Sequence, residues 1–210
     1  MSLADIRREY LGQPLSETGS DPDPFRQFAL WFEQVRGLEP DPTAMALATA
    51  TRDGRPSART VLLKGVDEKG FVFYTNYNSR KAREMAESGR ASLLFFWRSL
   101  ERQVRIDGTV EKVSGREADA YFATRPLESR WSVYASRQSD PVESRESLES
   151  RFEVARQIYG DTVPRPEWWG GYRVLPDEFE FWQGRTNRLH DRLRYRRRSD
   201  GAWDRARLAP

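Results

Sequence analysis

The residues best suited to chemistry lie near the C-terminus, in the segment RLHDRLRYR at positions 188–196. This segment contains the only histidine among the 210 residues, and two more arginines follow it directly. If the segment is a strand, successive side chains point to opposite faces. One face then holds Arg188, His190, Arg192, Arg194 and Arg196. So many fixed positive charges on one face repel each other unless anions or solvent separate them.

Three interpretations of this basic face differ in what covers it. A solvated edge strand uses charges to prevent edge-to-edge pairing, and this interpretation suits Arg194 to Arg198. Arg188, His190 and Arg192 instead follow WWGGY and FEFWQGR, whose flat rings suit a planar heterocycle with a phosphate. A nucleic acid could use the same groups. However, Lys+Arg exceeds Asp+Glu by only 35 to 32, whereas nucleic-acid binders usually have a larger excess.

Three further segments predict a second anion-binding region: RTVLLK (59–64), YTNYNSRK (74–81) and ERQVR (101–105). In a regular strand, Arg59 and Lys64 would point to opposite faces, so each could reach a different group of one ligand. Arg80 and Lys81 lie in the first turn of a predicted helix, where backbone N–H groups and the helix dipole favour anions. An ordinary exposed helix start is the alternative. Together, the segments indicate two separate anionic groups.

The elements that must position these residues are mostly strands. Alternating apolar residues and turn pairs such as Asp-Gly predict strands at 44–51, 57–66, 70–76, 91–97, 101–113, 170–175, 178–184, 188–198 and 202–210. Helices are predicted at 21–37, with Asp23 as N-cap, at 79–89, with Ser79 as N-cap and Gly89 as its end, at 115–126 and at 143–160. The segment between the last two helices predicts irregular structure. We expect a mobile N-terminal arm (1–20) and a single antiparallel barrel domain with helical insertions (21–210).

Composition excludes several kinds of site. There is no cysteine, so disulfides, thiolate metal sites and cysteine nucleophiles are excluded, and a single histidine argues against a histidine metal site. The N-terminal MSLADIRREYLGQPL has acidic residues and no long apolar run, unlike a signal peptide. No segment approaches the ~20 apolar residues that span a bilayer. We expect a soluble cytoplasmic protein that binds neither a metal, a membrane nor a nucleic acid.

Nearly the whole chain, from RREY at 7–10 to the last residue, resembles the pyridoxamine (pyridoxine) 5′-phosphate oxidase family. The motifs RTVLLK, FYTNYNSRKA, ERQVRI, YFATRP, SRQS, WGGYRV, EFWQGR, RLHDR and RLAP occur in the family's order. The resemblance implies a mainly β fold with α insertions, an antiparallel FMN-binding split β-barrel with flanking helices. It also implies a homodimer with FMN at the interface.

The resemblance further implies a reaction and its residues. Pyridoxamine and pyridoxine 5′-phosphate, the phosphorylated B6 vitamers, would be oxidised to pyridoxal 5′-phosphate, with O2 as acceptor and H2O2 released. FMN is assigned to Arg59, Thr60, Val61, Leu62, Leu63, Lys64, Tyr74, Thr75, Arg80, Lys81, Gln103, Gln138, Ser139, Trp182 and Arg192. The substrate is assigned to Arg7, Arg8, Glu9, Tyr10, Lys64, Tyr121, Arg125, Ser129, Arg188, Leu189 and His190. Arg188 and His190 are the expected catalytic pair.

Two departures from the family pattern and two alternatives accompany this assignment. Arg130, Trp131 and Tyr134 replace the usual residues of the expected substrate wall, and TNRLHD replaces a frequent PSRLHD. His190 could act as a base or only orient the substrate, and we expect orientation. One alternative function is a related flavin oxidase with another substrate, such as the phenazine-pathway relatives. The other is a non-catalytic binder of flavin or nucleic acid.

Overall fold

The longest strand, β7 (Trp169–Gln183), organises the sheet in the computed structural model, which describes residues 8–210. From residue 172 to its end it pairs with β6 (Arg102–Lys112) on one side. On the other side, its first half pairs with β4 (Phe71–Asn76) and its second half with β8 (Asp191–Arg197). The second edge therefore divides between two partners, as expected for a split barrel.

All pairings in the described sheet are antiparallel, and the strand order is β2-β1-β5-β6-β7-β4-β3, with β8 and β9 added beside β7. The remaining strands are β1 (Ala44–Ala50), β2 (Pro56–Leu62), β3 (Gly65–Val66), β5 (Arg90–Trp97) and β9 (Trp203–Arg207). The helices are α1 (Pro24–Val35), α2 (Arg80–Ser88), α3 (Gly115–Thr124), α4 (Leu127–Ala135) and α5 (Arg145–Tyr159), with short 3-10 turns η1 (Arg98–Leu100) and η2 (Thr186–Arg188). This confirms the predicted mainly β fold with helical insertions.

The prediction of two separate strands at 170–175 and 178–184 was wrong, because β7 runs through both. Pro176 lies opposite Gly108, and the register between β6 and β7 shifts at that point. Such a bulge tolerates a proline, which has no N–H for the ladder. A Cβ at Gly108 would lie 2.1 Å from the Leu175 carbonyl oxygen, so the close approach of the strands requires glycine. The Pro-Asp pair bends the strand and does not end it.

Three other predicted boundaries were wrong. The strand expected at 57–66 is divided into β2 and β3, with residues 63 and 64 in neither. The expected strand at 188–198 begins only at Asp191, because Asn187 and Arg188 adopt left-handed φ angles of 54° and 59° in the η2 turn. Arg188 and His190 therefore precede the strand. The segment after 126, expected to be irregular, forms α4. The buried side chains of α4 pack against α5 in a separate small core. The helix therefore depends on contacts with a later segment, which a local sequence pattern does not reveal.

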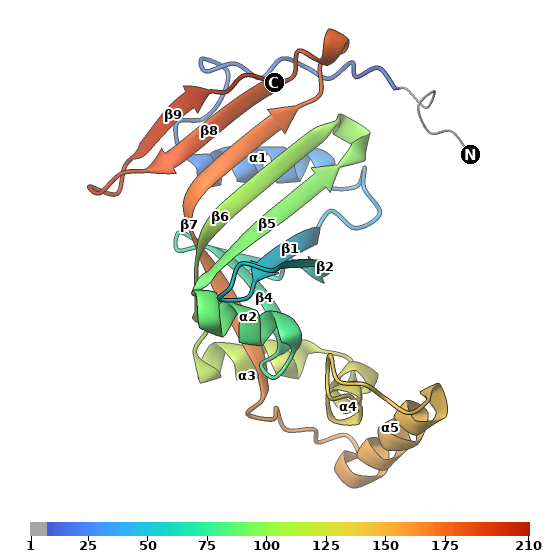
Figure 1. Cartoon of the computed structure of the whole chain (residues 1–210). Helices are drawn as coiled ribbons and strands as arrows, with labels where there is room; N and C mark the ends of the chain where they lie inside the picture. The colour runs from blue at the N-terminus through green and yellow to red at the C-terminus, as the bar shows by residue number, and fades with distance from the viewer. Residues whose placement is uncertain (1–7) are drawn as a thin grey trace.

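Helix α1 covers the concave side of the sheet, as Figure 1 shows behind β6 and β7. The Asp23 carboxylate accepts hydrogen bonds from the backbone N–H groups of Phe25 and Arg26 at 2.8 and 3.3 Å, which confirms the predicted N-cap. Phe28 of this helix lies with its ring centroid 4.9 Å from that of Phe71 and 5.2 Å from that of Phe95. These rings belong to the main core between α1 and the sheet.

The helical lobe, made of α3, α4 and α5, lies beyond one end of the sheet, opposite β8 and β9 (Figure 1). Two residues that depart from the family pattern serve this lobe. The Trp131 indole N–H donates to the Gly160 carbonyl at 2.9 Å, and the Tyr134 hydroxyl donates to the Pro164 carbonyl at 2.8 Å. Their hydrogen bonds thus connect α4 to the loop that follows α5.

The N-terminal arm, as far as it is described (8–20), follows the β8–β9 edge. Leu15 is buried in the main core, and its N–H donates to Asp191 at 3.1 Å. Arg205 donates to the Ser20 carbonyl at 3.0 Å. These contacts place the arm next to the strands whose ends hold the predicted catalytic pair. Its mobility stays a prediction.

Candidate active site

The start of α2 gathers the first group of predicted FMN residues, here named the helix-start cluster: Arg59, Thr75, Arg80, Lys81, Gln138 and Ser139. Ser79 caps the helix by accepting from the Ala82 N–H at 3.4 Å, and Gly89 ends it with a left-handed φ of 68°, as predicted. The cap places Arg80 in the first turn. Its backbone N–H donates to the Ser139 hydroxyl at 3.1 Å, which brings the loop after α4 to the helix start.

Lys81 is the buried cation of the helix-start cluster. Its ammonium donates to the Thr75 hydroxyl at 3.1 Å, to the Gln138 amide oxygen at 3.1 Å and to the Ser79 hydroxyl at 3.4 Å. All three acceptors are neutral. Burial, and to a smaller degree the nearby Arg59 charge, lowers the pKa of Lys81 to about 8. A buried ammonium among neutral acceptors is suited to bind an added anion, so these residues fit a phosphate group.

Arg59 completes the charge of this cluster from strand β2. One guanidinium nitrogen donates to the Leu47 carbonyl at 2.9 Å and to the Thr49 hydroxyl at 2.6 Å. The other lies 3.4 Å from a carboxylate oxygen of Glu84. The guanidinium is therefore held in one orientation by strand β1 and helix α2. A fixed guanidinium loses little conformational entropy when it binds an oxyanion.

The rest of the segment 59–64 divides between two sides, as predicted. Val61 and Leu63 are partly or fully buried on the side of Arg59, whereas Thr60, Leu62 and Lys64 are exposed. The regular strand ends at Leu62. The exposed side of this edge strand faces no other part of the described chain, which leaves it open to a ligand or a second subunit.

Aromatic rings next to the cluster form a stacked wall. The Tyr74 ring lies parallel to Tyr121, with centroids 3.8 Å apart, and 5.6 Å from Trp169. The wall depends on Gly171, because a Cβ there would come within 2.9 Å of the Tyr74 ring. The Arg125 guanidinium lies 4.6 Å from the Trp169 ring centroid.

A cavity of about 360 Å³ joins the predicted cofactor and substrate residues. Its lining includes Tyr74, Thr75 and Gln138, which were assigned to FMN, and Arg125, which was assigned to the substrate. Arg125 donates to the Ser129 carbonyl at 2.8 Å, so these two substrate residues are neighbours. Burial lowers the pKa of Arg125 but raises those of Tyr121 and Tyr74, the last to about 12. The tyrosines are therefore neutral hydroxyl groups at physiological pH.

The second group, here named the β7–β8 cluster, consists of Gln103, Trp182, Arg188, His190 and Arg192. Gln103 and Arg192 both lie opposite Trp182, so three predicted FMN residues form one row across β6, β7 and β8. Arg192 donates to Glu180 at 2.8 Å and to the Ala209 carbonyl at 2.7 Å. The C-terminal residues thus help to hold the Arg192 guanidinium.

His190 has one nitrogen already occupied. Its Nδ1 accepts a hydrogen bond from the Arg185 backbone N–H at 3.1 Å, and its ring centroid lies 4.7 Å from that of Trp182. Burial and the nearby Arg188 charge lower the pKa of His190. Nδ1 is therefore an acceptor, and the proton of the neutral imidazole lies on Nε2.

The described part of the N-terminal arm reaches this cluster. Tyr10 contacts both Trp182 and His190 edge to face, with centroid distances of 5.5 Å. Arg8 forms a 3.0 Å salt bridge with Glu101, and the Leu11 N–H donates to the same carboxylate at 2.7 Å. Glu9 is exposed, as are Arg188 and Leu189, and Arg7 lies outside the described residues. Tyr10 thus lies against His190, one of the predicted catalytic pair.

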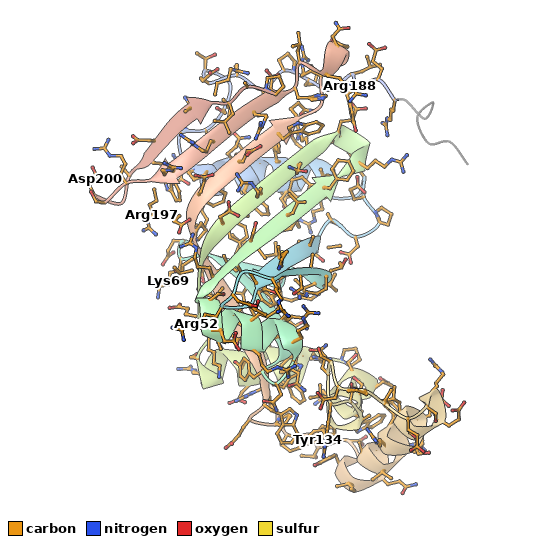
Figure 2. The ribbon with its side chains drawn as sticks, viewed as in Figure 1. Arg52, Lys69, Tyr134, Arg188, Arg197 and Asp200 are labelled. Atoms are coloured by element: carbon orange, nitrogen blue, oxygen red, sulfur yellow. The ribbon has the colours of Figure 1, made fainter. Side chains whose placement is uncertain are left out.

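One chain does not bring the two clusters together. Figure 2 shows Arg188 at one end of the molecule and Tyr134 of the helical lobe at the other. The β7–β8 cluster includes Arg188 at the first end, whereas the helix-start cluster lies at α2, between the sheet and the helical lobe (Figure 1). Residues assigned to one FMN molecule are thus divided between distant parts of the chain.

Between residues 8 and 210, no group of three or more His, Asp or Glu side chains is arranged to hold a metal ion. Within the same range, no helix has both the length and the apolar character needed to cross a bilayer.

Three residues that the sequence interpretation missed support the site. Glu84 contacts both Arg59 and Arg80, Glu101 anchors the arm, and the Arg185 N–H fixes the His190 tautomer. The spacing of Arg80 and Glu84, four residues apart on a predicted helix, is a signal for an ion pair. The other two contacts connect distant or irregular segments, and no local pattern indicates them.

Comparisons with known proteins agree with this geometry. Residues 31–159 match the family model described as pyridoxamine 5′-phosphate oxidase, and residues 169–210 match the model of the pyridoxine 5′-phosphate oxidase C-terminal dimerisation region. A pyridoxine/pyridoxamine 5′-phosphate oxidase of Rubrobacter xylanophilus is 60% identical over 210 residues, covering 99% of this chain and 96% of the relative.

Two solved structures are also similar. PhzG from Burkholderia lata, in complex with tetrahydrophenazine-1-carboxylic acid, has a TM-score of 0.89 at 34% identity and covers 95% of this chain and 99% of its own. A pyridoxamine 5′-phosphate oxidase-related, FMN binding protein from Nostoc punctiforme has a TM-score of 0.74 at 17% identity, covering 90% of this chain and 100% of its own, and so shares the fold.

Proposed function

Because this chain belongs to the pyridoxamine 5′-phosphate oxidase family, we propose that the helix-start cluster of one subunit and the β7–β8 cluster of its homodimer partner form one active site. The enzyme oxidises pyridoxamine and pyridoxine 5′-phosphate to pyridoxal 5′-phosphate, with FMN as cofactor, O2 as electron acceptor and H2O2 as product. With the amine substrate, water is also consumed and ammonia is released. Pairing of the two clusters across the interface explains why a single chain leaves them apart.

In this proposal the helix-start cluster binds the phosphate of FMN. Lys81, Arg59 and Arg80 supply positive charge, and the helix dipole of α2 adds to it. The Ser139 hydroxyl accepts from the Arg80 backbone N–H, so its own proton is available to donate to the phosphate. The row of Gln103, Trp182 and Arg192 contributes from the other subunit. Acceptance of a hydride from the substrate and transfer of the electrons to O2 is the chemistry that FMN supplies when bound.

The substrate phosphate is assigned to Lys64, Tyr121, Arg125 and Ser129. The observation that supports the proposal most is the shared cavity, because Arg125 lines it together with Tyr74, Thr75 and Gln138. A phosphorylated pyridine bound at Arg125 would thus lie beside the flavin residues. Two flat rings held face to face need fixed positions more than they need a nucleophile.

The catalytic pair orients the substrate. His190 presents Nε2–H as a donor, because its Nδ1 accepts from the Arg185 backbone N–H. A nitrogen that holds a proton cannot also remove one, so His190 acts as a hydrogen-bond donor. Arg188 adds a fixed charge on the exposed η2 turn, in a left-handed conformation (φ 59°) that the tight turn imposes. Tyr10 of the arm covers His190, and we propose that the arm closes over bound substrate.

An oxidase assay tests this proposal directly. Purified protein is loaded with FMN, and peroxide release is measured with pyridoxine 5′-phosphate, pyridoxamine 5′-phosphate and tetrahydrophenazine-1-carboxylic acid. Turnover of the two vitamers supports the proposed activity. Turnover of the tetrahydrophenazine compound alone would contradict it. A cytoplasmic location is also proposed, and cell fractionation tests it.

A further inference from the structure

A carboxylate lies at the centre of the basic helix-start cluster. Glu84 is on α2, one helical turn after Arg80, and is only 3% exposed. A buried acid beside a phosphate site should repel the ligand, so its position requires an explanation. Its contacts provide one.

Glu84 connects the two arginines to the sheet. One carboxylate oxygen accepts from the Arg80 guanidinium at 2.8 Å. The other accepts from the Thr49 and Ser57 hydroxyls, both at 2.5 Å, and lies 3.4 Å from Arg59. Strands β1 and β2 thus fix the carboxylate, and the carboxylate in turn fixes a guanidinium on each side.

The net charge of the cluster, counted with Glu84, is also equal and opposite to that of a phosphate. Arg59, Arg80 and Lys81 are three cations, and Glu84 is one anion, which leaves two net positive charges. A phosphomonoester near neutral pH has a charge of about −2. Burial alone would raise the pKa of Glu84, but hydrogen bonds from Ser57, Thr49 and Arg80 outweigh it and hold the pKa at about 2. The carboxylate is therefore ionised at every working pH.

We propose that Glu84 is a positioning residue for the FMN phosphate, aligning the Arg59 and Arg80 guanidinium groups on one anion. This inference rests on the proposed function, because it takes the phosphate of FMN as the ligand. Glu84 itself contacts the arginines and not the phosphate. Its loss should therefore weaken binding of the phosphorylated flavin and leave the affinity for the unphosphorylated flavin unchanged.

The test compares the dissociation constants of FMN and riboflavin by quenching of flavin fluorescence in apoprotein variants. Glu84→Gln should raise the FMN constant about tenfold or more, which corresponds to about 1.4 kcal/mol, with no change for riboflavin. Glu84→Asp keeps the charge but shortens the side chain, so it should weaken FMN binding to a similar extent. Glu87→Gln, on the exposed side of the same helix, is the matched control and should match the parent protein.

Several outcomes would overturn the inference. Unchanged or tighter FMN binding by Glu84→Gln would contradict it. A Glu84→Asp variant that binds FMN as tightly as the parent protein would also contradict it, because the negative charge alone would then be sufficient. Equal loss of FMN and riboflavin would indicate a purely structural role.

A second variant covers the case in which Glu84→Gln does not fold. Ser57→Ala removes one donor to the carboxylate and one acceptor of the Arg59 guanidinium, so it loosens the Glu84–Arg59 contact from both sides. It should weaken FMN binding about threefold without affecting riboflavin, and the absence of this effect would refute the positioning role. If the parent protein does not bind FMN, the proposed function fails instead, so the two failures are distinguishable.

Discussion

Raising the pH from 7 to 9 should weaken FMN binding about tenfold, because Lys81 loses its proton in the empty site over this range. Burial lowers the pKa of Lys81 from 10.5 to about 8, which corresponds to about 3 kcal/mol lost from the charged form. The phosphate should bind the protonated lysine. At pH 9 only about one tenth of the empty sites have that form, since the pH lies one unit above the pKa.

Two ionisable groups beside the cluster, Glu84 and Tyr74, do not titrate in this range. The pKa of Glu84 is about 2 and that of Tyr74 about 12, and the phosphate is already a dianion, since its second pKa is about 6. The change of FMN affinity with pH between 7 and 9 therefore reports the protonation of Lys81. The measurement is the FMN dissociation constant of the apoprotein by fluorescence quenching, at constant ionic strength.

Lys81→Met isolates this effect. The variant keeps the buried stem but has no charge, so it should bind FMN more weakly at pH 7 and show no slope up to pH 9. It should also stabilise the apoprotein, because a buried ammonium with only neutral acceptors is removed. Lys69→Met, at an exposed turn, is the control. A parent protein whose FMN affinity is constant with pH, or a Lys81→Met variant that keeps the slope, would refute the reasoning.

Three further predictions concern the substrate side and the core. Arg188→Leu should lower turnover about a hundredfold while the flavin absorption of the purified protein stays unchanged, and equal turnover would remove Arg188 from the site. His190 is the only histidine, so nitrogen NMR of the imidazole should show one Nε2–H tautomer at pH 7. Turnover of His190→Gln should fall by less than the roughly 10²–10⁴-fold expected for removal of a general base. Phe95→Ala, at a fully buried position, should lower the free energy of unfolding by about 3–5 kcal/mol in a denaturant titration, whereas Leu30→Ala, 54% exposed on α1, should change it by about 0.5 kcal/mol or less.

Local chemistry made much of the fold predictable. The α1 N-cap at Asp23 and the α2 limits at Ser79 and Gly89 follow from hydrogen bonds and dihedral angles within a few residues, and the structure has them where the sequence predicts them. Strand locations also follow from local alternation. The errors occur where distant contacts decide. Pro176 ends no strand because Gly108 on the neighbouring strand provides a bulge.

The candidate site divides in the same way. The cations in RTVLLK and NSRK, and the unique histidine beside arginines, follow from residue type and spacing, and they indicated phosphate ligands before any fold was known. The alternating faces of Arg59 and Leu62 follow from strand geometry, whereas Lys64 lies beyond the end of β2. The alternation assumed for Arg188 failed, because the η2 turn replaces the start of the strand.

The sequence by itself determined the types of chemical group, their local secondary structure and, through its motifs, the family. Only the tertiary structure decided that Glu84 lies between Arg59 and Arg80, that the Arg185 N–H occupies Nδ1 of His190, and that the two clusters lie far apart in one chain. The physical reason is the sequence distance over which each interaction acts. Capping and alternation act between residues close in sequence, whereas the orientation of a charged side chain depends on partners that the chain brings together only when the sheet forms.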